Sequence, residues 1–222
     1  GAVNDDPINA GALPTDITVT EDVASNVDLS VIDLFDADAG GSSLTVTLST
    51  STGGNLTAST SAGVTVGGSG SGTLTLTGSQ TDLNTYLNTA SNITYLHGTA
   101  NRNGDNSDTI TVVVNDNGNT GSGGGTDQNL GSVNVDIAAV NDTPDVVAPG
   151  AAYTVNEQTD LSIHGTGFTV SDVDAASGPV TATLNVGEGI ITVAAGDSGI
   201  TIDSGSGTGS VALSGTLAQI NN

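Results

Sequence analysis

The chain contains two sets of one pattern, an Asn-Asp pair followed further along the sequence by an Asp-x-Asp motif. The two sets are Asn4, Asp5, Asp36 and Asp38, and Asn141, Asp142, Asp172 and Asp174. Carboxylate and amide oxygens are hard ligands, and Ca²⁺ takes six to eight of them in flexible geometry. We therefore expect each set to supply ligands to a Ca²⁺ ion. The alternative is that each Asp only accepts hydrogen bonds from its own turn, as isolated Asp residues commonly do.

Four more acidic residues join these sets if the expected strands alternate in direction. Asp116 would then lie at the same end of the first domain as Asn4, Asp5, Asp36 and Asp38. Glu21, Asp105 and Asp108 would lie at the opposite end, beside the Asn141-Asp142 linker and the Asp172-x-Asp174 motif. The sequence therefore predicts one cation site at the N-terminal end of the first domain and another at the junction between two domains.

Charge and composition exclude several classes of partner. The 222 residues carry a formal net charge of −23, and Arg102 is the one basic residue besides two histidines. Nothing in such a chain neutralises phosphates, so nucleic acid and anionic membrane surfaces are excluded as partners. No apolar run approaches the roughly 20 residues of a membrane-spanning helix, so we expect no membrane insertion. Because cysteine is absent, disulfides and thiolate metal sites are excluded as well.

The elements that position the acidic residues belong to an internal repeat. Five sequence blocks recur in the same order at nearly constant spacing. The clearest pairs are residues 2–7 with 139–144, residues 18–21 with 154–157, and residues 36–39 with 172–175. We therefore predict two copies of one domain, at residues 1–142 and 143–222. The second copy ends level with residue 85 of the first, and we expect it to lack its last two strands.

Within each copy, apolar residues alternate with Thr, which is the period of half-buried strands. The predicted strands of the first copy are residues 16–20, 27–32, 44–49, 55–59, 73–77, 109–114 and 130–138. Residues 64–66 form a possible extra strand, and residues 81–88 a helical turn. Short strands with turn signals and no long helix indicate an all-β fold of tandem Greek-key β-sandwiches, Ig-like in type, with the second incomplete.

The chain resembles the cadherin-like tandem repeats of large bacterial calcium-dependent surface adhesins. The resemblance is carried by residues 139–144 (Ala-Val-Asn-Asp-Thr-Pro), 154–157, 171–175 and 114–118. It implies an extracellular, secreted or cell-surface location, and Ca²⁺ bridging consecutive domains through Glu21, Asn141, Asp142, Asp172 and Asp174. It also implies a non-catalytic spacer for adhesion, a fibre or a biofilm, with neighbouring repeats of the same chain as partners.

Other functions remain as alternatives. A self-assembling filament would complete the second domain with strands from identical subunits. A carbohydrate-binding module would bind cell-surface glycans. Catalysis is not expected, because His97 and His164 occupy different positions in the repeat and nothing in the sequence marks either as a positioned base.

Overall fold

The computed structural model describes residues 3–119 and 121–222, and Gly1, Ala2 and Thr120 lie outside the described residues. The chain divides into two compact units, unit 1 at Gly1–Val140 and unit 2 at Asn141–Asn222. The division falls two residues before the predicted domain boundary. Each unit is all-β with several sheets, and each is described below by itself.

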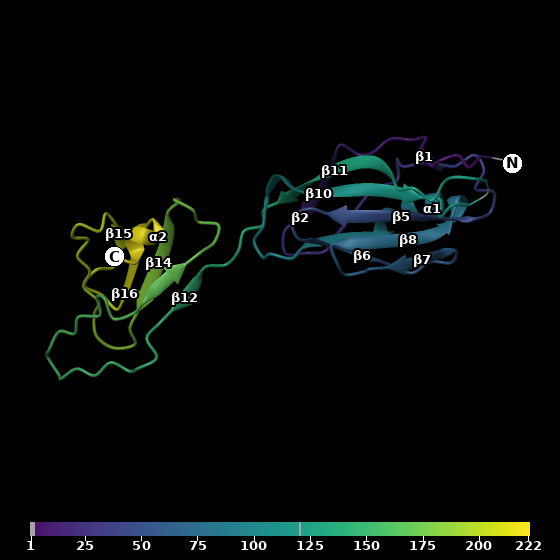
Figure 1. Ribbon diagram of the computed structural model, residues 1–222. Helices are drawn as coiled ribbons and strands as arrows, with labels where there is room; N and C mark the ends of the chain where they lie inside the picture. The colour runs from purple at the N-terminus through teal and green to yellow at the C-terminus, as the bar shows by residue number, and fades with distance from the viewer. Residues whose placement is uncertain (1–2, 120) are drawn as a thin grey trace. The chain divides into compact units, whose positions relative to one another are not determined.

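Unit 1 is built from two main sheets. The six-stranded sheet, whose strands are labelled in Figure 1, has the order β2-β11-β10-β5-β8-β7. The three-stranded sheet has the order β3-β9-β6. The strands of the first are β2 (Asp16–Thr20), β5 (Ser43–Thr50), β7 (Val64–Gly67), β8 (Thr73–Ser79), β10 (Gly104–Asn115) and β11 (Gln128–Ala138). Those of the second are β3 (Ser25–Asn26), β6 (Gly54–Ala58) and β9 (Ile93–His97).

One hydrophobic core joins the two sheets. Leu44, Val46 and Leu48 of β5 are fully buried, while the Thr residues between them are only partly covered. Leu56 of β6 and Tyr95 of β9 enter the same cluster from the other sheet. The alternation of apolar residues with Thr therefore has the cause expected from the sequence, one buried and one outward face.

Strand β2, near the start of unit 1, and strand β11, near its end, pair with each other within the six-stranded sheet. All other paired strands of unit 1 are antiparallel, but β2 runs parallel to β11, with Asp16 opposite Asn134 and Thr20 opposite Ala138. A further two-stranded ladder, β1 (Ile8–Asn9) with β4 (Leu34–Phe35), holds the first residues of the unit. Helix α1 (Gln80–Leu87) packs Leu83, Tyr86 and Leu87 into the core, and the turn η1 (Ala90–Asn92) follows it.

Unit 2 repeats part of this arrangement. Strands β14 (Val180–Asn185), β15 (Thr201–Ser204) and β16 (Ser210–Gly215) form a sheet of order β14-β16-β15, matching β5-β8-β7 of unit 1 (Figure 1). Strands β12 (Asp145–Val147) and β13 (Thr169–Ser171) pair as β1 and β4 do. The short helix α2 (Leu217–Ile220) follows β16 as α1 follows β8.

One predicted strand is absent from unit 1, and an observed strand was not predicted. Residues 27–32 form no strand, although Val27 and Leu29 are buried, because Asp28 Oδ1 accepts a hydrogen bond from Ser30 N at 3.0 Å and Ile32 N donates to Leu29 O at 3.0 Å. These local bonds replace a ladder. Conversely, β9 was not predicted from the sequence. Residues 64–66 do form a strand, within β7.

Candidate metal centre

The N-terminal acidic corner consists of Asn4, Asp5, Asp36 and Asp38, all in unit 1. The turn at Asp36 is closed by its own side chain, because Oδ1 accepts hydrogen bonds from Asp38 N at 3.1 Å and Ala39 N at 2.9 Å. Asp5 N donates to Asp38 Oδ2 at 3.4 Å, which brings the Asn-Asp pair to the Asp-x-Asp turn. The structure therefore brings these four predicted residues together.

Asn4 is held in one orientation. Its Nδ2 donates to Asp5 O at 3.0 Å and to Asp116 Oδ2 at 2.5 Å, so both amide hydrogens are used. Turning the amide over would place an oxygen against two acceptors. Asn4 is 8% exposed, and its Oδ1 is buried without a hydrogen-bond partner. A buried amide oxygen without a donor is unusual in proteins, and a bound ion or water is one way to satisfy it.

Asp36 presents the second buried oxygen of this kind. The residue is 6% exposed, and its Oδ2 has no hydrogen-bond partner while Oδ1 closes the turn. Burial raises the pKa of Asp36, and the neighbouring Asp38 carboxyl raises it further. A positive charge placed beside both carboxyls would offset this penalty.

Asp116 positions Asn4. Its carboxylate is fully buried, and Oδ1 accepts hydrogen bonds from Gly118 N at 3.0 Å and Gly125 N at 2.8 Å. Burial alone would raise the pKa of Asp116, but these bonds and the one from Asn4 hold it below its usual range. The chain needs glycine at Gly124, because φ is +86° and a Cβ there would collide with the Asn4 amide.

Unit 2 carries the same contacts in the linker acidic corner, which we define as Asn141, Asp142, Asp172 and Asp174. Asp172 Oδ1 accepts from Asp174 N at 2.9 Å and Ala175 N at 2.9 Å, as Asp36 does in its own turn. Asp142 N donates to Asp174 Oδ2 at 2.5 Å, and Asn141 Nδ2 donates to Asp142 O at 2.9 Å. Four hydrogen bonds of one pattern thus occur in both units.

Glu21 lies at the end of β2 in unit 1 and is 3% exposed. Its Oε1 accepts a hydrogen bond from Val140 N at 2.7 Å, and its Oε2 accepts from Asn103 Nδ2 at 2.9 Å. Glu21 therefore fastens the last residue of unit 1 to β2. The carboxylates of Glu21, Asp142 and Asp174 each offer one oxygen that could bind a metal ion.

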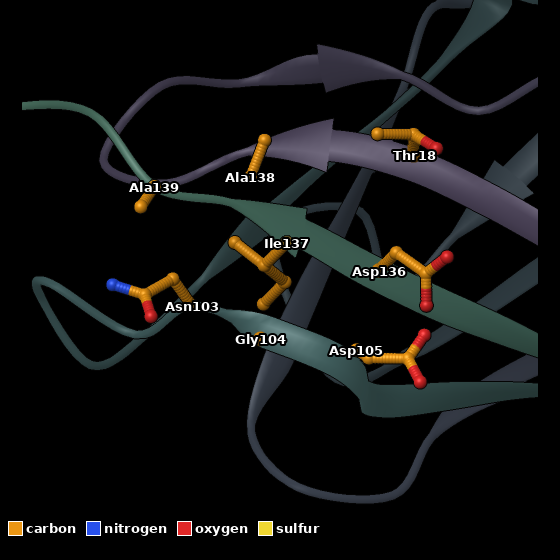
Figure 2. A pocket seen from close by; sticks show the side chains of 8 residues that line it. All are labelled: Thr18, Asn103, Gly104, Asp105, Asp136, Ile137, Ala138 and Ala139. Atoms are coloured by element: carbon orange, nitrogen blue, oxygen red, sulfur yellow. The ribbon is translucent and has the colours of Figure 1, made fainter.

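Asp105 lies in a shallow depression of unit 1 of about 390 Å³. Figure 2 shows Thr18 of β2, Asp136 of β11 and Asp105 of β10 on its three neighbouring strands. Asp136 Oδ1 accepts a hydrogen bond from Asn106 N at 2.8 Å, and Asp105 is exposed. The depression carries acidic side chains but no buried oxygen that lacks a partner among the described residues.

The prediction that Asp108 binds a cation is wrong. The residue is 1% exposed, and hydrogen bonds from both sheets occupy its two oxygens. The donors to Oδ1 are Ser51 N, Ser51 Oγ, Thr52 N and Thr109 N, and the donors to Oδ2 are Gly54 N and Tyr95 Oη. Burial would raise the pKa of Asp108, but these bonds outweigh it and hold the pKa well below its usual range. Asp108 therefore joins the β5–β6 turn to β10 and β9.

Sequence reasoning missed Asn103, the donor to Glu21, whose only signal was an amide in the same loop as Asp105. Arg102, its neighbour, donates from Nη2 to Ser107 O at 3.2 Å within that loop. His97 is buried and only 9% exposed. Its Nδ1 accepts from Thr99 N at 3.1 Å, and its Nε2 lies 3.1 Å from Thr52 O. Among the described residues, the hydrogen-bond partners of this ring are backbone atoms of Thr52 and Thr99, and none is a nucleophilic side chain.

No protein-family model matches the chain, and no curated protein matches it significantly. The helices of residues 3–119 and 121–222 are all too short or too polar to cross a membrane.

Proposed function

We propose that this chain is a non-catalytic spacer of an extracellular surface protein, stiffened by Ca²⁺ bound at its acidic corners. The observation that carries the proposal is the pair of buried oxygens without hydrogen-bond partners, Asn4 Oδ1 and Asp36 Oδ2, in one acidic corner. With the Asp38 carboxylate, they form a set made only of oxygen ligands, as Ca²⁺ prefers. Backbone carbonyls and waters would complete the shell.

The contacts in unit 2 extend the proposal to the linker. Its acidic corner repeats the hydrogen bonds of the N-terminal one, so it should take the same ion. Glu21 is fastened to Val140, and Val140 is followed directly by Asn141 and Asp142. Glu21 thus orders the last residue of unit 1, and a Ca²⁺ ion at the linker acidic corner would order the first residues of unit 2. Order on both sides of the Val140–Asn141 bond would leave the linker less free to bend, which is how a spacer of tandem domains gains stiffness.

Calorimetry tests the first site directly. Extracellular Ca²⁺ modules bind at roughly 10⁻⁴ to 10⁻³ M, so 10 mM Ca²⁺ should stabilise each site by about 1.4 to 2.7 kcal/mol relative to chelator. For a unit of this size, that corresponds to a rise in Tm of about 4 to 8 °C. Mg²⁺ at the same concentration should do less, because it demands octahedral geometry and releases its waters reluctantly.

The variant Asp36→Asn gives the sharper test, because its effect should reverse sign. In Ca²⁺ it removes a charged ligand and should lower Tm. In chelator it removes the repulsion between Asp36 and Asp38 while keeping an oxygen for Asp38 N and Ala39 N, so Tm should rise. Asp160→Asn, at an exposed residue of unit 2, makes the same change of net charge away from the corner and is the control. An unchanged melting curve in Ca²⁺ for the wild type would contradict the proposal.

A further inference from the structure

The route of the chain through unit 1 determines how the unit would respond to tension. The chain enters β2 at Asp16 and leaves β11 at Ala138, and these two residues lie at opposite ends of one parallel ladder. Pulling on the segment just before β2 and on the residues just after β11 therefore slides β2 along β11. In such sliding, all bonds of the ladder bear the load together, because the bonds of a parallel pair are evenly spaced along it.

The ladder is fastened at both ends. At its start, Asn134 N donates to Thr15 O at 3.2 Å, and Asn134 Nδ2 donates to Asp16 Oδ1 at 3.2 Å. At its finish, Glu21 N donates to Ala138 O at 3.0 Å, and the Glu21 carboxylate holds Val140 N. A sliding displacement must break these contacts in the same step as the ladder.

The core opposes sliding as well. Ile17 and Val19 of β2 are 6% and 2% exposed, and they pack in the hydrophobic cluster. A shift of one residue along the ladder would turn both side chains to the outer face. β2 is also an edge strand, paired only with β11, whereas β11 is paired on its other side with β10. The β2–β11 contact is therefore the one whose rupture frees the chain.

From this geometry we propose that unit 1 is a tension-bearing module, and that the parallel β2–β11 ladder is its mechanical clamp. The proposal goes beyond cation binding, because the ladder lies within the sheet and needs no ion. Forced unfolding is governed by the barrier to unfolding rather than by equilibrium stability. Resistance should therefore depend on the direction of pulling even when the free energy of unfolding does not change.

Single-molecule pulling on the full 222-residue chain tests the clamp. The chain has no cysteine, so two introduced cysteines define the points of attachment. Ala12→Cys with Val140→Cys pulls β2 and β11 from opposite ends and loads the ladder in shear. Val23→Cys with Val140→Cys pulls both strands from the same end and peels them apart one bond at a time. All three residues have exposed side chains.

We expect the unfolding force to be several-fold higher in the shear pair than in the peeling pair, in Ca²⁺ and in chelator alike. Equal forces in the two pairs would overturn the proposal. A difference that vanishes in chelator would also overturn it, because a bound cation and not the ladder would then carry the load. Urea unfolding must give both double variants the same stability, and Thr15→Cys replaces Ala12→Cys if the latter destabilises the unit.

Discussion

Unit 1 and unit 2 share their local contacts but differ in what they bury. Val19 of unit 1 is 2% exposed and its repeat counterpart in unit 2, Val155, is 53% exposed. Ile32 is 2% exposed and its counterpart Phe168 is 39% exposed. Among residues 141–222, all of which the structure describes, the buried hydrophobic side chains are Val211 and Leu213. Residues 141–222 contain no counterpart of β9, β10 or β11.

The comparison separates what a short segment can form from what needs distant strands. The acidic corner forms in both units, because three of its four bonds join residues no more than three positions apart. The core forms in unit 1, where β10 and β11 extend the sheet of β5 and residues such as Leu56 and Tyr95 of the other sheet join the same hydrophobic cluster. The corner is therefore a local motif, and the core is a product of long-range pairing.

The largest effect should come from Asp108→Ala, which removes the contact that most clearly distinguishes unit 1. Four backbone N–H groups and the Tyr95 hydroxyl would lose their buried acceptor. We expect the free energy of unfolding of unit 1 to fall by about 3 to 5 kcal/mol. Urea unfolding followed by circular dichroism measures it. A loss below that of an average surface substitution would show that Asp108 does not hold the two sheets together.

The same carboxylate should give unit 1 a dependence on acid. The folded pKa of Asp108 is depressed, so its contribution to stability is present above the unfolded pKa of about 3.9 and is lost as the pH falls toward the folded value. Stability of the wild type should therefore fall below about pH 4 more steeply than that of Asp108→Asn. Parallel slopes in an acid titration would contradict this assignment.

An intermediate effect is expected from Asp172→Asn combined with Asp174→Asn in unit 2. The linker acidic corner should bind Ca²⁺ even though unit 2 buries few hydrophobic side chains. In that case 10 mM Ca²⁺ should slow hydrogen exchange at the Asp174 and Ala175 amides of the wild type by about 10- to 100-fold. The double variant should lose this protection, while exchange in unit 1 stays unchanged. Asp160→Asn with Asp197→Asn makes the same change of charge elsewhere in unit 2. Protection lost in this control as well would point to net charge and not to a site.

The smallest effect compares one helix cap in its two copies. Ser79 Oγ accepts from Asp82 N at the start of α1, and Thr216 Oγ1 accepts from Gln219 N at the start of α2. Ser79→Ala should lower the free energy of unfolding of unit 1 by about 1 kcal/mol. Thr216→Ala should leave that unfolding transition unchanged. A shift of the unit 1 transition by Thr216→Ala would show that the two units unfold together.

The sequence predicted the elements whose signals are local. The strand at residues 16–20 coincides with β2, and the helical turn at residues 81–88 differs from α1 by one residue at each end. The turn chemistry of the Asp-x-Asp motif follows from the tendency of Asp to bond the backbone two residues on. The pairing of Asn4-Asp5 with Asp36-x-Asp38 was expected from the repeat alone.

What the sequence did not predict depends on contacts far apart in the chain. Asp108 has the same surroundings in sequence as an exposed turn residue, and its role comes from donors on Ser51–Gly54, more than 50 positions away. Val27 and Leu29 alternate like strand residues, yet the side chain of Asp28 supplies the competing local bond. Whether a carboxylate faces a cation or a set of amides is decided by the fold, and residue type alone does not reveal it.

Arg102 has a consequence for how the chain is degraded. Trypsin-like proteases cleave after Lys or Arg, and the chain has one such residue in 222. The single susceptible bond, Arg102–Asn103, lies in the loop where Asn103 holds Glu21 and Arg102 holds Ser107 O. Because the chain has almost no Lys or Arg, proteases of this class have almost no site at which to cleave it. The one bond that such enzymes can cut belongs to the loop that helps to fasten the end of the first unit.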